Sequence, residues 1–442
     1  MKTAAHTLQQ YGTGRGVCRK VFTLALFTLA LISANARADQ LSAPLTLAKA
    51  LSFADSDHPE LSLVDADLAY AVSTRLDVDT SNNLDAYLEV APYMSEPTTG
   101  NEFLSDSYIR LSVSKTLYDF GYSDAREDAA DESIMSKELI AQDTRNKNYL
   151  KIMQLYFDVL LADLHYAAVD EEMTTLYVQY DKLRERHSLG MVSDVTLATA
   201  ENLYREVADL RKNSEKEQQA SRLRLAIALN RPDDIPVDLV RPDLPQLEWP
   251  LPEPDTLLTT ALSNNLMLTA LEHAMFADKA ALKAAQQKFG PTLAAGLELN
   301  EYDRNLPSRN TASVGLTLRF PLTGSSRSQA ESARVSAELS ASQARYDQAK
   351  YSLRQQLSDL VNRLEILQFK RTTAQQRLNS TALNVEKSRA RYELELETTL
   401  GISMAKYTEA EWLSAKNDFA IATTWAQIEL LTGKKLYQER EN

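Results

Sequence analysis

Residues 353–378 read LRQQLSDLVNRLEILQFKRTTAQQRL, and this stretch sets the character of the whole chain. Its apolar side chains recur at alternating spacings of four and three residues, with Arg371 as the one polar member of the series. They are Leu353, Leu357, Leu360, Leu364, Leu367, Ala374 and Leu378. This spacing is typical of the seam along which a helix packs in a coiled coil. The surrounding run from Ser325 to Arg391 contains no glycine or proline, so at about 1.5 Å of rise per residue it predicts one helix of roughly 100 Å.

A second run of the same length lies about 200 residues upstream. Between Gly121 and His187 there is again no internal glycine or proline. This stretch has a seam of its own, at Tyr149, Met153, Tyr156, Leu160 and Ala167. Two equal rods in one chain predict an elongated molecule built by internal duplication, because a compact domain has no need of helices this long.

The N-terminus has the pattern of a secretory signal peptide. Basic residues precede an apolar run over residues 21–32, and the small-residue pattern Ala-Arg-Ala follows at residues 36–38. We expect residues 1–38 to be removed as a signal. The only cysteine, Cys18, lies before the apolar run. This position argues against a lipoprotein anchor and leaves the mature chain without a thiol.

Charge and hydropathy exclude several classes of protein. The chain has 48 Lys and Arg against 61 Asp and Glu, a formal net charge of −13, and loss of the five basic residues of the predicted signal makes it −18. This balance argues against nucleic acid as a partner and favours cations or basic surfaces. After the signal we identify no segment apolar enough, over a sufficient length, for a transmembrane helix. A soluble protein or a β-barrel remains.

The two halves of the chain repeat one order of predicted elements. Each has an amphipathic helix, two strands, a rod, a tip turn and a returning helix, and His58-Pro59 and Asn264-Asn265 interrupt the two amphipathic helices at matching places. Seven of the 14 prolines lie between Asn230 and Asp255 and predict an extended connection. The predicted domains are the signal (1–38), a first repeat (39–229), the connection (230–254), a second repeat (255–433) and a C-terminal tail (434–442).

Each pair of predicted strands alternates apolar and polar residues. The strands cover about residues 84–90 and 109–114 in the first half and 293–300 and 314–319 in the second, and a polar loop joins each pair. Period two is the signature of a transmembrane barrel strand, although a soluble hairpin in a mixed domain has the same alternation. In a barrel, Arg110 and Arg319 would face the lumen. The predicted lipid-facing residues are Ile109, Leu111, Val113, Leu297, Val314, Leu316 and Leu318.

Four strands in one chain cannot close a barrel, because about eight is the smallest closed number. Open strand edges are not tolerated in lipid, so we expect three copies to share a barrel of twelve strands. The rods of the same copies would form a hollow cylinder beneath it, with the heptad seams packing neighbours. The expected fold class is therefore an α+β membrane protein, a trimeric 12-stranded β-barrel with four strands per protomer, continued by a long antiparallel α-helical tunnel.

With these features the chain resembles the TolC-type outer-membrane factor family over its whole mature length. The tip turns of the family have the pattern Arg-Tyr-x-x-Gly-x-x-Ser followed by a helix with alanine. The first copy matches it at Arg186, Gly190, Ser193 and Ala200. The second copy matches it at Arg391, Tyr392, Thr398 and Ala405, but has Glu395 in place of the glycine.

The resemblance implies a homotrimeric channel-tunnel in the outer membrane of a Gram-negative cell, projecting into the periplasm. It would be a passive conduit for substrates delivered by an inner-membrane pump of the RND, ABC or MFS type through a periplasmic adaptor, or membrane fusion, protein. Small-molecule or drug efflux is the expected function. Type I protein secretion is the alternative within transport, and a periplasmic coiled-coil scaffold is the alternative outside it.

The resemblance also directs attention to the second tip. Members of the family carry two acidic residues just after it, which narrow the entrance and favour cations. Here Gly401 and Met404 stand at those positions, and acidic residues lie before them instead. The candidates for the entrance constriction are Tyr392, Glu393, Glu395, Glu397, Gly401 and Met404. Repeated by threefold symmetry, the glutamates would form a selectivity ring; the other reading is a solvated run of charge.

Apolar residues at the tips are candidates for docking. They are Leu189, Gly190, Met191, Leu394 and Leu396, and we expect them to bind the adaptor, although they would also serve as caps of the helical hairpins. We identify no catalytic, cofactor or metal motif in the sequence. His165 lies on a rod and is read as a packing or surface residue. The sequence therefore calls for no enzyme activity and no cofactor.

Overall fold

The computed structural model describes residues 44–55, 58–81, 83–96, 102–304, 309–322, 325–394 and 400–433. The predicted signal and C-terminal tail lie outside the described residues. The same holds for three of the predicted tip residues, Glu395, Leu396 and Glu397.

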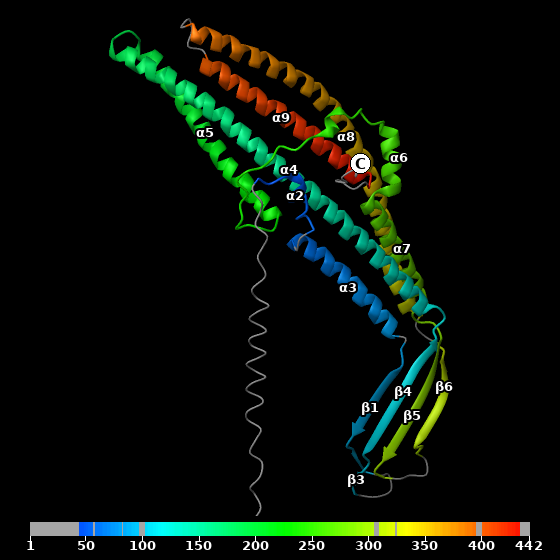
Figure 1. Cartoon of the computed structure of the whole chain (residues 1–442). Coiled ribbons are helices and arrows are strands. Elements are labelled where there is room, and N and C mark those ends of the chain that lie inside the picture. The colour runs from blue at the N-terminus through cyan, green and yellow to red at the C-terminus, as the bar shows by residue number, and fades with distance from the viewer. Residues whose placement is uncertain are drawn as a thin grey trace, which may run out of the picture.

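The chain is an elongated layer of helices that continues at one end into a small sheet (Figure 1). Two helices run the length of the layer: α4 (Tyr122–Ser188, 67 residues) and α8 (Ser325–Glu393, 69 residues). The two predicted rods are confirmed. At the end far from the sheet each rod turns back into a shorter antiparallel helix, α5 (Asp194–Ala228) or α9 (Leu400–Leu431).

Four shorter helices complete the layer. They are α2 (Leu47–Leu51), α3 (Pro59–Ser81), α6 (Pro254–Asn264) and α7 (Leu266–Gln287). Helix α4 packs against α3 and α5 and also against α7 and α9, and α8 packs against α7 and α9. One edge of the layer is therefore made by α3 and α5, and the other by α8 (Figure 1).

The short helices break where the sequence predicts. Between α6 and α7, the side-chain oxygen of Asn265 accepts a hydrogen bond from the Leu268 backbone N–H at 2.8 Å, and its amide nitrogen donates to the Leu431 carbonyl at 3.0 Å. In the first half α2 ends at Leu51 and α3 begins at Pro59. An asparagine before the first helical residue satisfies a backbone donor that the helix leaves unpaired. The second break is therefore capped locally and also attached to α9.

The sheet has the order β1-β4-β5-β6, and every neighbouring pair is antiparallel. Its strands are β1 (Asp85–Ala91), β4 (Tyr108–Tyr118), β5 (Thr292–Tyr302) and β6 (Ala312–Arg319). In the loop between β1 and β4, the two-residue strands β2 (Met94–Ser95) and β3 (Leu104–Ser105) also pair. The sequence predicted only a loop there, because two residues are too few to show a period of two.

The largest core cluster lies in the middle of the layer, where the connection crosses α4. Phe157 of α4 and Phe419 of α9 stack there with ring centroids 4.5 Å apart. The fully buried Tyr156 donates hydrogen bonds from its hydroxyl to the carbonyls of Leu45 at 2.8 Å and Val240 at 2.6 Å. Buried backbone carbonyls require such partners, so this tyrosine fixes both the N-terminal segment and the connection to the rod.

The seam of α8 packs inside its own chain. Leu364 and Leu367 belong to a core cluster with residues of α9, and Leu353 and Leu357 belong to another with residues of α6 and α7. For these residues the neighbouring helices that the seam packs belong to the same chain. The reason is topological, since the short and returning helices of the same chain cover this face first.

Arg371, the polar member of the seam, lies where the proline-rich connection crosses α8. Its guanidinium donates to the Leu247 carbonyl at 3.1 Å and to Glu248 at 3.2 Å, both near the 3-10 helix η1 (Pro245–Glu248). The same group lies 3.4 Å from Asp418 of α9. Burial raises the pKa of Asp418, and the charge of Arg371 acts in the opposite direction. The break in the apolar series is thus the attachment point of the connection.

One helix of the described chain, α4, contains an 18-residue window apolar enough to cross a membrane by length and composition. Its mean hydropathy is 1.2, and half of the window is buried inside the chain. The sequence predicted no such window, and this prediction is wrong. Core helices have the same composition when one side is buried.

Candidate functional site

The sheet separates apolar from polar side chains by its register. Cross-strand partners lie on one face, and Val113 pairs with Leu297, which pairs with Val314 on its other side. Leu111 likewise lies between Leu88 and Leu299. The register puts all seven predicted lipid-facing residues on this apolar face. Six of them are exposed in the single chain, from 37% for Leu111 to 85% for Val314.

The opposite face of the sheet is polar, and the charges around Arg110 are paired. Arg110 donates to the Asn300 side-chain oxygen at 3.0 Å and lies 2.9 Å from Glu298 and 3.5 Å from Glu89. Arg319 lies on the same face. Apart from Lys115 and Glu301, which the register places on the apolar side, the sheet has one face suited to an apolar environment and one suited to water, as the strand alternation predicts.

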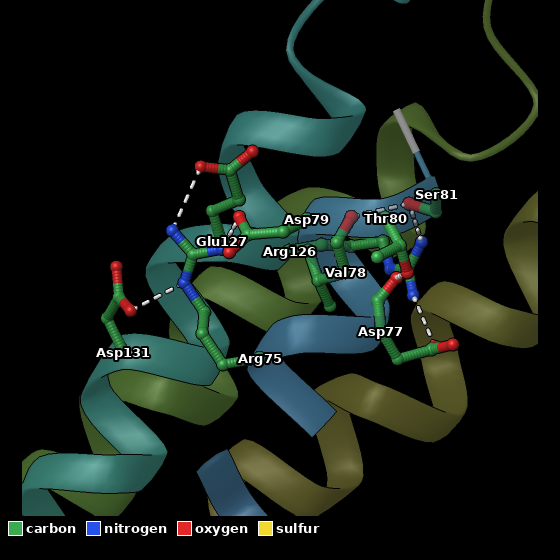
Figure 2. Close-up of polar contacts among 9 residues, drawn as sticks. All are labelled: Arg75, Asp77, Val78, Asp79, Thr80, Ser81, Arg126, Glu127 and Asp131. Atoms are coloured by element: carbon green, nitrogen blue, oxygen red, sulfur yellow. Dashed lines mark hydrogen bonds and ion pairs between the residues drawn. The ribbon is translucent and has the colours of Figure 1, made fainter. Parts of the chain in front are cut away.

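Ion pairs hold α3 to α4 close to the sheet (Figure 2). Arg75 of α3 lies 2.6 Å from Asp131 and 3.2 Å from Glu127 of α4. The hydrogen bond to Asp131 is the main cause that raises the pKa of Arg75. In the same region Arg126 donates to the Ser81 hydroxyl at 3.3 Å. These contacts join the edge helix to the rod just before the chain enters β1.

The first tip joins α4 to α5 by a turn that needs its glycine. Gly190 has φ +72°, a conformation that is strained for other residues. Its N–H donates to the His187 carbonyl at 2.9 Å, and the Met191 N–H donates to the Arg186 carbonyl at 3.0 Å. Bonds of this kind satisfy carbonyls that the helix end leaves free. Leu189 and Met191 are left 65% and 66% exposed.

The start of α5 closes the first tip. The Ser193 hydroxyl accepts a hydrogen bond from the Thr196 N–H at 3.3 Å, and His187 and Asp194 face each other across the turn at 2.6 Å. Val195, which the sequence analysis did not select, is 75% exposed beside them. The sequence does not show whether a valine in the first turn of a helix is exposed. That depends on which side of the turn other elements cover, and only the fold decides this.

The described part of the second tip is exposed but has a different character. Tyr392 and Leu394 are 56% and 68% exposed at the end of α8, and Glu393 is exposed between them. Met404 of α9 is partly exposed. Tyr392, Glu393 and Leu394 thus lie together, whereas Met404 lies in the first turns of α9.

Gly401 lies at a close crossing of two helices. A Cβ added to it would come within 2.8 Å of the Thr175 hydroxyl of α4. The second hairpin is therefore packed against the first near its tip, and this contact has no room for a side chain at residue 401. The sequence suggested Gly401 by position, but this contact with α4 was not visible in it.

A cavity of about 260 Å³ lies between α8 and α9 behind the second tip. It is lined by Thr381, Asn384, Lys387, Ser388, Arg391, Ile402, Ser403 and Lys406. The hydroxyls of Ser388 and Ser403 hydrogen bond across it at 2.7 Å. Lys387 and Lys406 were missed by sequence reasoning, which weighed only the acidic residues of this tip. The available signal was the change of the seam from leucine to Thr381 and Ser388.

The histidines of the described chain have local partners. His165 packs on Trp412 at 4.5 Å between ring centroids, and burial lowers its pKa. His273 lies 2.6 Å from Glu132. Within the described residues, no group of three or more His, Cys, Asp or Glu side chains is placed to hold a metal ion.

One protein family matches part of the chain by sequence. Its residues 257–431 match the family described as "Outer membrane efflux protein". Comparison with characterised proteins by sequence finds no match.

Several solved structures have the same fold. They include the Campylobacter jejuni CmeC outer membrane channel, with a TM-score of 0.73, 14% identity and coverage of 90% of this chain and 87% of that one. The Vibrio cholerae outer membrane protein VceC has a TM-score of 0.69 and 16% identity, with coverage of 88% and 97%. The Neisseria gonorrhoeae MtrE outer membrane channel has a TM-score of 0.71 and 16% identity, with coverage of 90% and 91%.

At these identities the structural likeness shows the fold, and the family match covers residues 257–431. The chain is thus similar to the outer membrane efflux protein family over residues 257–431, and it shares its fold with solved outer membrane channels.

Proposed function

We propose that this chain forms, as a homotrimer, a passive conduit through the outer membrane and the periplasm. In this proposal an inner-membrane pump delivers small molecules through a periplasmic adaptor that docks on the tips. The observation that carries it is the combination of a two-faced open sheet with a layer of helices whose rods, at 67 and 69 residues, are roughly 100 Å long. The family match supports efflux as the direction of transport.

The open edges support closure by copies of the same chain. Strands β1 and β6 are the edge strands of the four-stranded sheet, and unpaired edges are not stable in lipid. In the helical layer, Tyr70 of edge helix α3 is 75% exposed, and Phe369 of edge helix α8 is 78% exposed. Exposed aromatic residues on opposite edges suit a head-to-tail ring, in which α3 and β1 of one copy meet α8 and β6 of the next.

Within the ring, the two faces of the sheet define outside and inside. We assign the apolar face with Leu111 and Leu316 to lipid, and the polar face with Arg110 and Arg319 to the lumen. A charge on the lipid face is unfavourable by about 2 to 4 kcal/mol near mid-membrane. If the polar face were turned toward lipid, each of its paired charges would lie in lipid, so that orientation is disfavoured.

The tips are the proposed periplasmic end. We assign adaptor docking to the exposed apolar residues Leu189, Met191 and Leu394, with Gly190 shaping the first turn. We assign the entrance constriction to the second tip, at Tyr392, Glu393, Glu395, Glu397, Gly401 and Met404. Exposed apolar groups on an otherwise charged helical end mark a contact with another protein.

The experiment is to express the full chain in a Gram-negative host, separate inner and outer membranes, and purify the protein in detergent. We expect it in the outer membrane, trimeric by mass, and conducting ions as single channels in a planar bilayer. Deletion of the gene in its own cell should raise sensitivity to small toxic compounds. A stable monomer with full strand content, or a trimer without conductance, would overturn the proposal.

A further inference from the structure

The cavity behind the second tip is unlike the rest of this acidic molecule. Three of its lining residues, Lys387, Arg391 and Lys406, are cationic, and its lining includes no acidic residue. The whole chain carries a formal net charge of −13. A cationic concavity on such a molecule is a local reversal of the prevailing potential.

The cavity exists because the helix seam changes composition toward the tip. Near the middle of α8, Leu364 and Leu367 fill the space between α8 and α9. At the tip the corresponding positions hold Thr381 and Ser388, which face Ser403 of α9. Small hydroxyl side chains leave the space between the helices open. They also line it with hydrogen-bond donors.

The two lysines of the cavity are available to an outside group. Among the described residues neither Lys387 nor Lys406 forms an ion pair, whereas Arg377, farther from the tip on the same helix, pairs with Glu409 of α9 at 2.9 Å. Two ammonium groups, the Asn384 amide and the serine hydroxyls are donors of the kind that bind a carboxylate. The volume of about 260 Å³ admits a glutamate or aspartate side chain.

The surroundings of the cavity favour a protein as the occupant. Arg391 is two residues from the end of α8, and the exposed Tyr392, Glu393 and Leu394 follow it. An apolar rim beside a cationic socket is complementary to a protein surface that presents an acidic side chain among apolar ones. The acidic remainder of the chain repels the same side chain elsewhere, so the socket would set the orientation of docking.

We propose that this cavity receives an acidic side chain of the protein that docks on the tips. The inference rests on the proposed function, since it concerns the partner of the same tip. It adds the chemistry that the partner must present, namely a carboxylate next to an apolar contact.

The test uses the full-length trimer in detergent at about 150 mM salt, where the screening length is about 8 Å. The probes are a fluorescent hexaglutamate peptide and its hexaglutamine counterpart, and the measurement is fluorescence anisotropy. We expect wild-type protein to bind hexaglutamate at least about tenfold more tightly than hexaglutamine. The variant Lys387→Gln/Lys406→Gln should lose this difference. The control variant Lys279→Gln/Lys370→Gln removes the same charge from exposed lysines outside the cavity and should keep it.

Equal binding of the two peptides by wild-type protein would overturn the inference. Inorganic phosphate that displaces hexaglutamate as effectively as unlabelled peptide does would also overturn it. The cavity would then be a site for small anions. Should the double variant fail to assemble, wild-type protein still decides the question by amine labelling and mass spectrometry. Hexaglutamate should slow the labelling of Lys387 and Lys406 at least about fivefold and leave Lys279 unchanged, and unslowed labelling would again overturn the inference.

Single-channel conductance of the same preparations separates this inference from the proposed function. Trimers that conduct but do not distinguish the peptides would contradict only the acidic socket. Trimers that do not conduct would contradict the conduit itself, whatever the peptides do.

Discussion

The two ends of the long helices differ in how their apolar and charged side chains are distributed. At the sheet end, the register puts most exposed apolar residues on one face, with charges such as Arg110 and Glu298 paired on the other. At the tip end, apolar and charged side chains are mixed over short distances, with Leu394 beside Glu393 and a cationic cavity behind them. Apolar and polar side chains on separate faces suit a boundary between lipid and water. Apolar and charged side chains mixed over short distances suit recognition of another protein.

The two ends also differ in the polarity of the seam of α8. Near the middle of α8, Leu364 and Leu367 pack in a core cluster, and near the tip the seam residue Ser388 forms a hydrogen bond with Ser403. Packing of leucines contributes more to stability than a hydroxyl pair does. The tip end should therefore be the weaker end of the layer, and the sheet end the more sensitive to charge.

The largest effect is expected from a charge on the apolar face of the sheet. Leu316→Arg should destabilise insertion by about 2 to 4 kcal/mol and greatly reduce the yield of trimer in the outer membrane. Thr317→Arg, one residue away on the polar face, is the matched control and should leave the yield close to wild type. Trimer yields are compared by native mass measurement after detergent extraction. Equal yields would contradict the assignment of the faces.

The second effect concerns the close crossing at the tip. Gly401→Ala places a Cβ 2.8 Å from the Thr175 hydroxyl, and overpacking of this kind typically destabilises by about 1 to 3 kcal/mol. Thr175→Ala should relieve the clash, so the double variant should be more stable than Gly401→Ala alone. The measurement is a double-mutant cycle by thermal unfolding of the trimer.

The control for that cycle lies at the other end of the molecule. Gly315 in β6 has no atom within 4 Å of an added Cβ, so Gly315→Ala should change the melting temperature little. Additive effects of Gly401→Ala and Thr175→Ala would show that the two helices separate at the tip in the assembled protein.

Charged substitutions at the first tip should have a smaller effect on stability but a large effect on export. The double variant Leu189→Glu/Met191→Glu changes exposed side chains, so the unfolding free energy should shift by no more than about 0.5 kcal/mol per residue. Export by living cells should nevertheless fall, because the apolar docking surface is lost. Val237→Glu, at a similarly exposed residue of the connection, is the control. Export that survives the tip variant while the trimer is intact would argue against docking at this tip.

The smallest effect is expected from the acidic run of the second tip. Cation selectivity and block by trivalent metal ions at the tip side should both weaken when Glu393, Glu395 and Glu397 are replaced by glutamine, without loss of trimer. The change should be modest, about twofold in the permeability ratio, because neighbouring cations such as Lys387 and Lys406 already offset the glutamates. Reversal potentials of single channels measure it. An unchanged ratio would identify the run as solvated surface.

Much of the architecture follows from patterns that are local in the sequence. The rods are read from uninterrupted runs such as Ser325 to Arg391, and the strand faces from period two around Leu111 and Leu316. The break before α7 is read from Asn265. The candidate site is recovered less fully, because its cavity joins residues from two helices, and no local pattern predicts that Lys387 and Lys406 line the same space.

The sequence by itself determined the length of the helices, the two faces of the sheet, the position of the tips and the duplicated order of the elements. Each of these depends on spacing within a single segment, which hydrogen bonding and hydrophobic periodicity encode directly. Only the tertiary structure decided that the seam of α8 is covered by its own chain, that Arg371 attaches the connection, and that Gly401 lies against Thr175. These contacts depend on which segments meet in space, and that choice is made by competition among all the apolar surfaces of the chain at once.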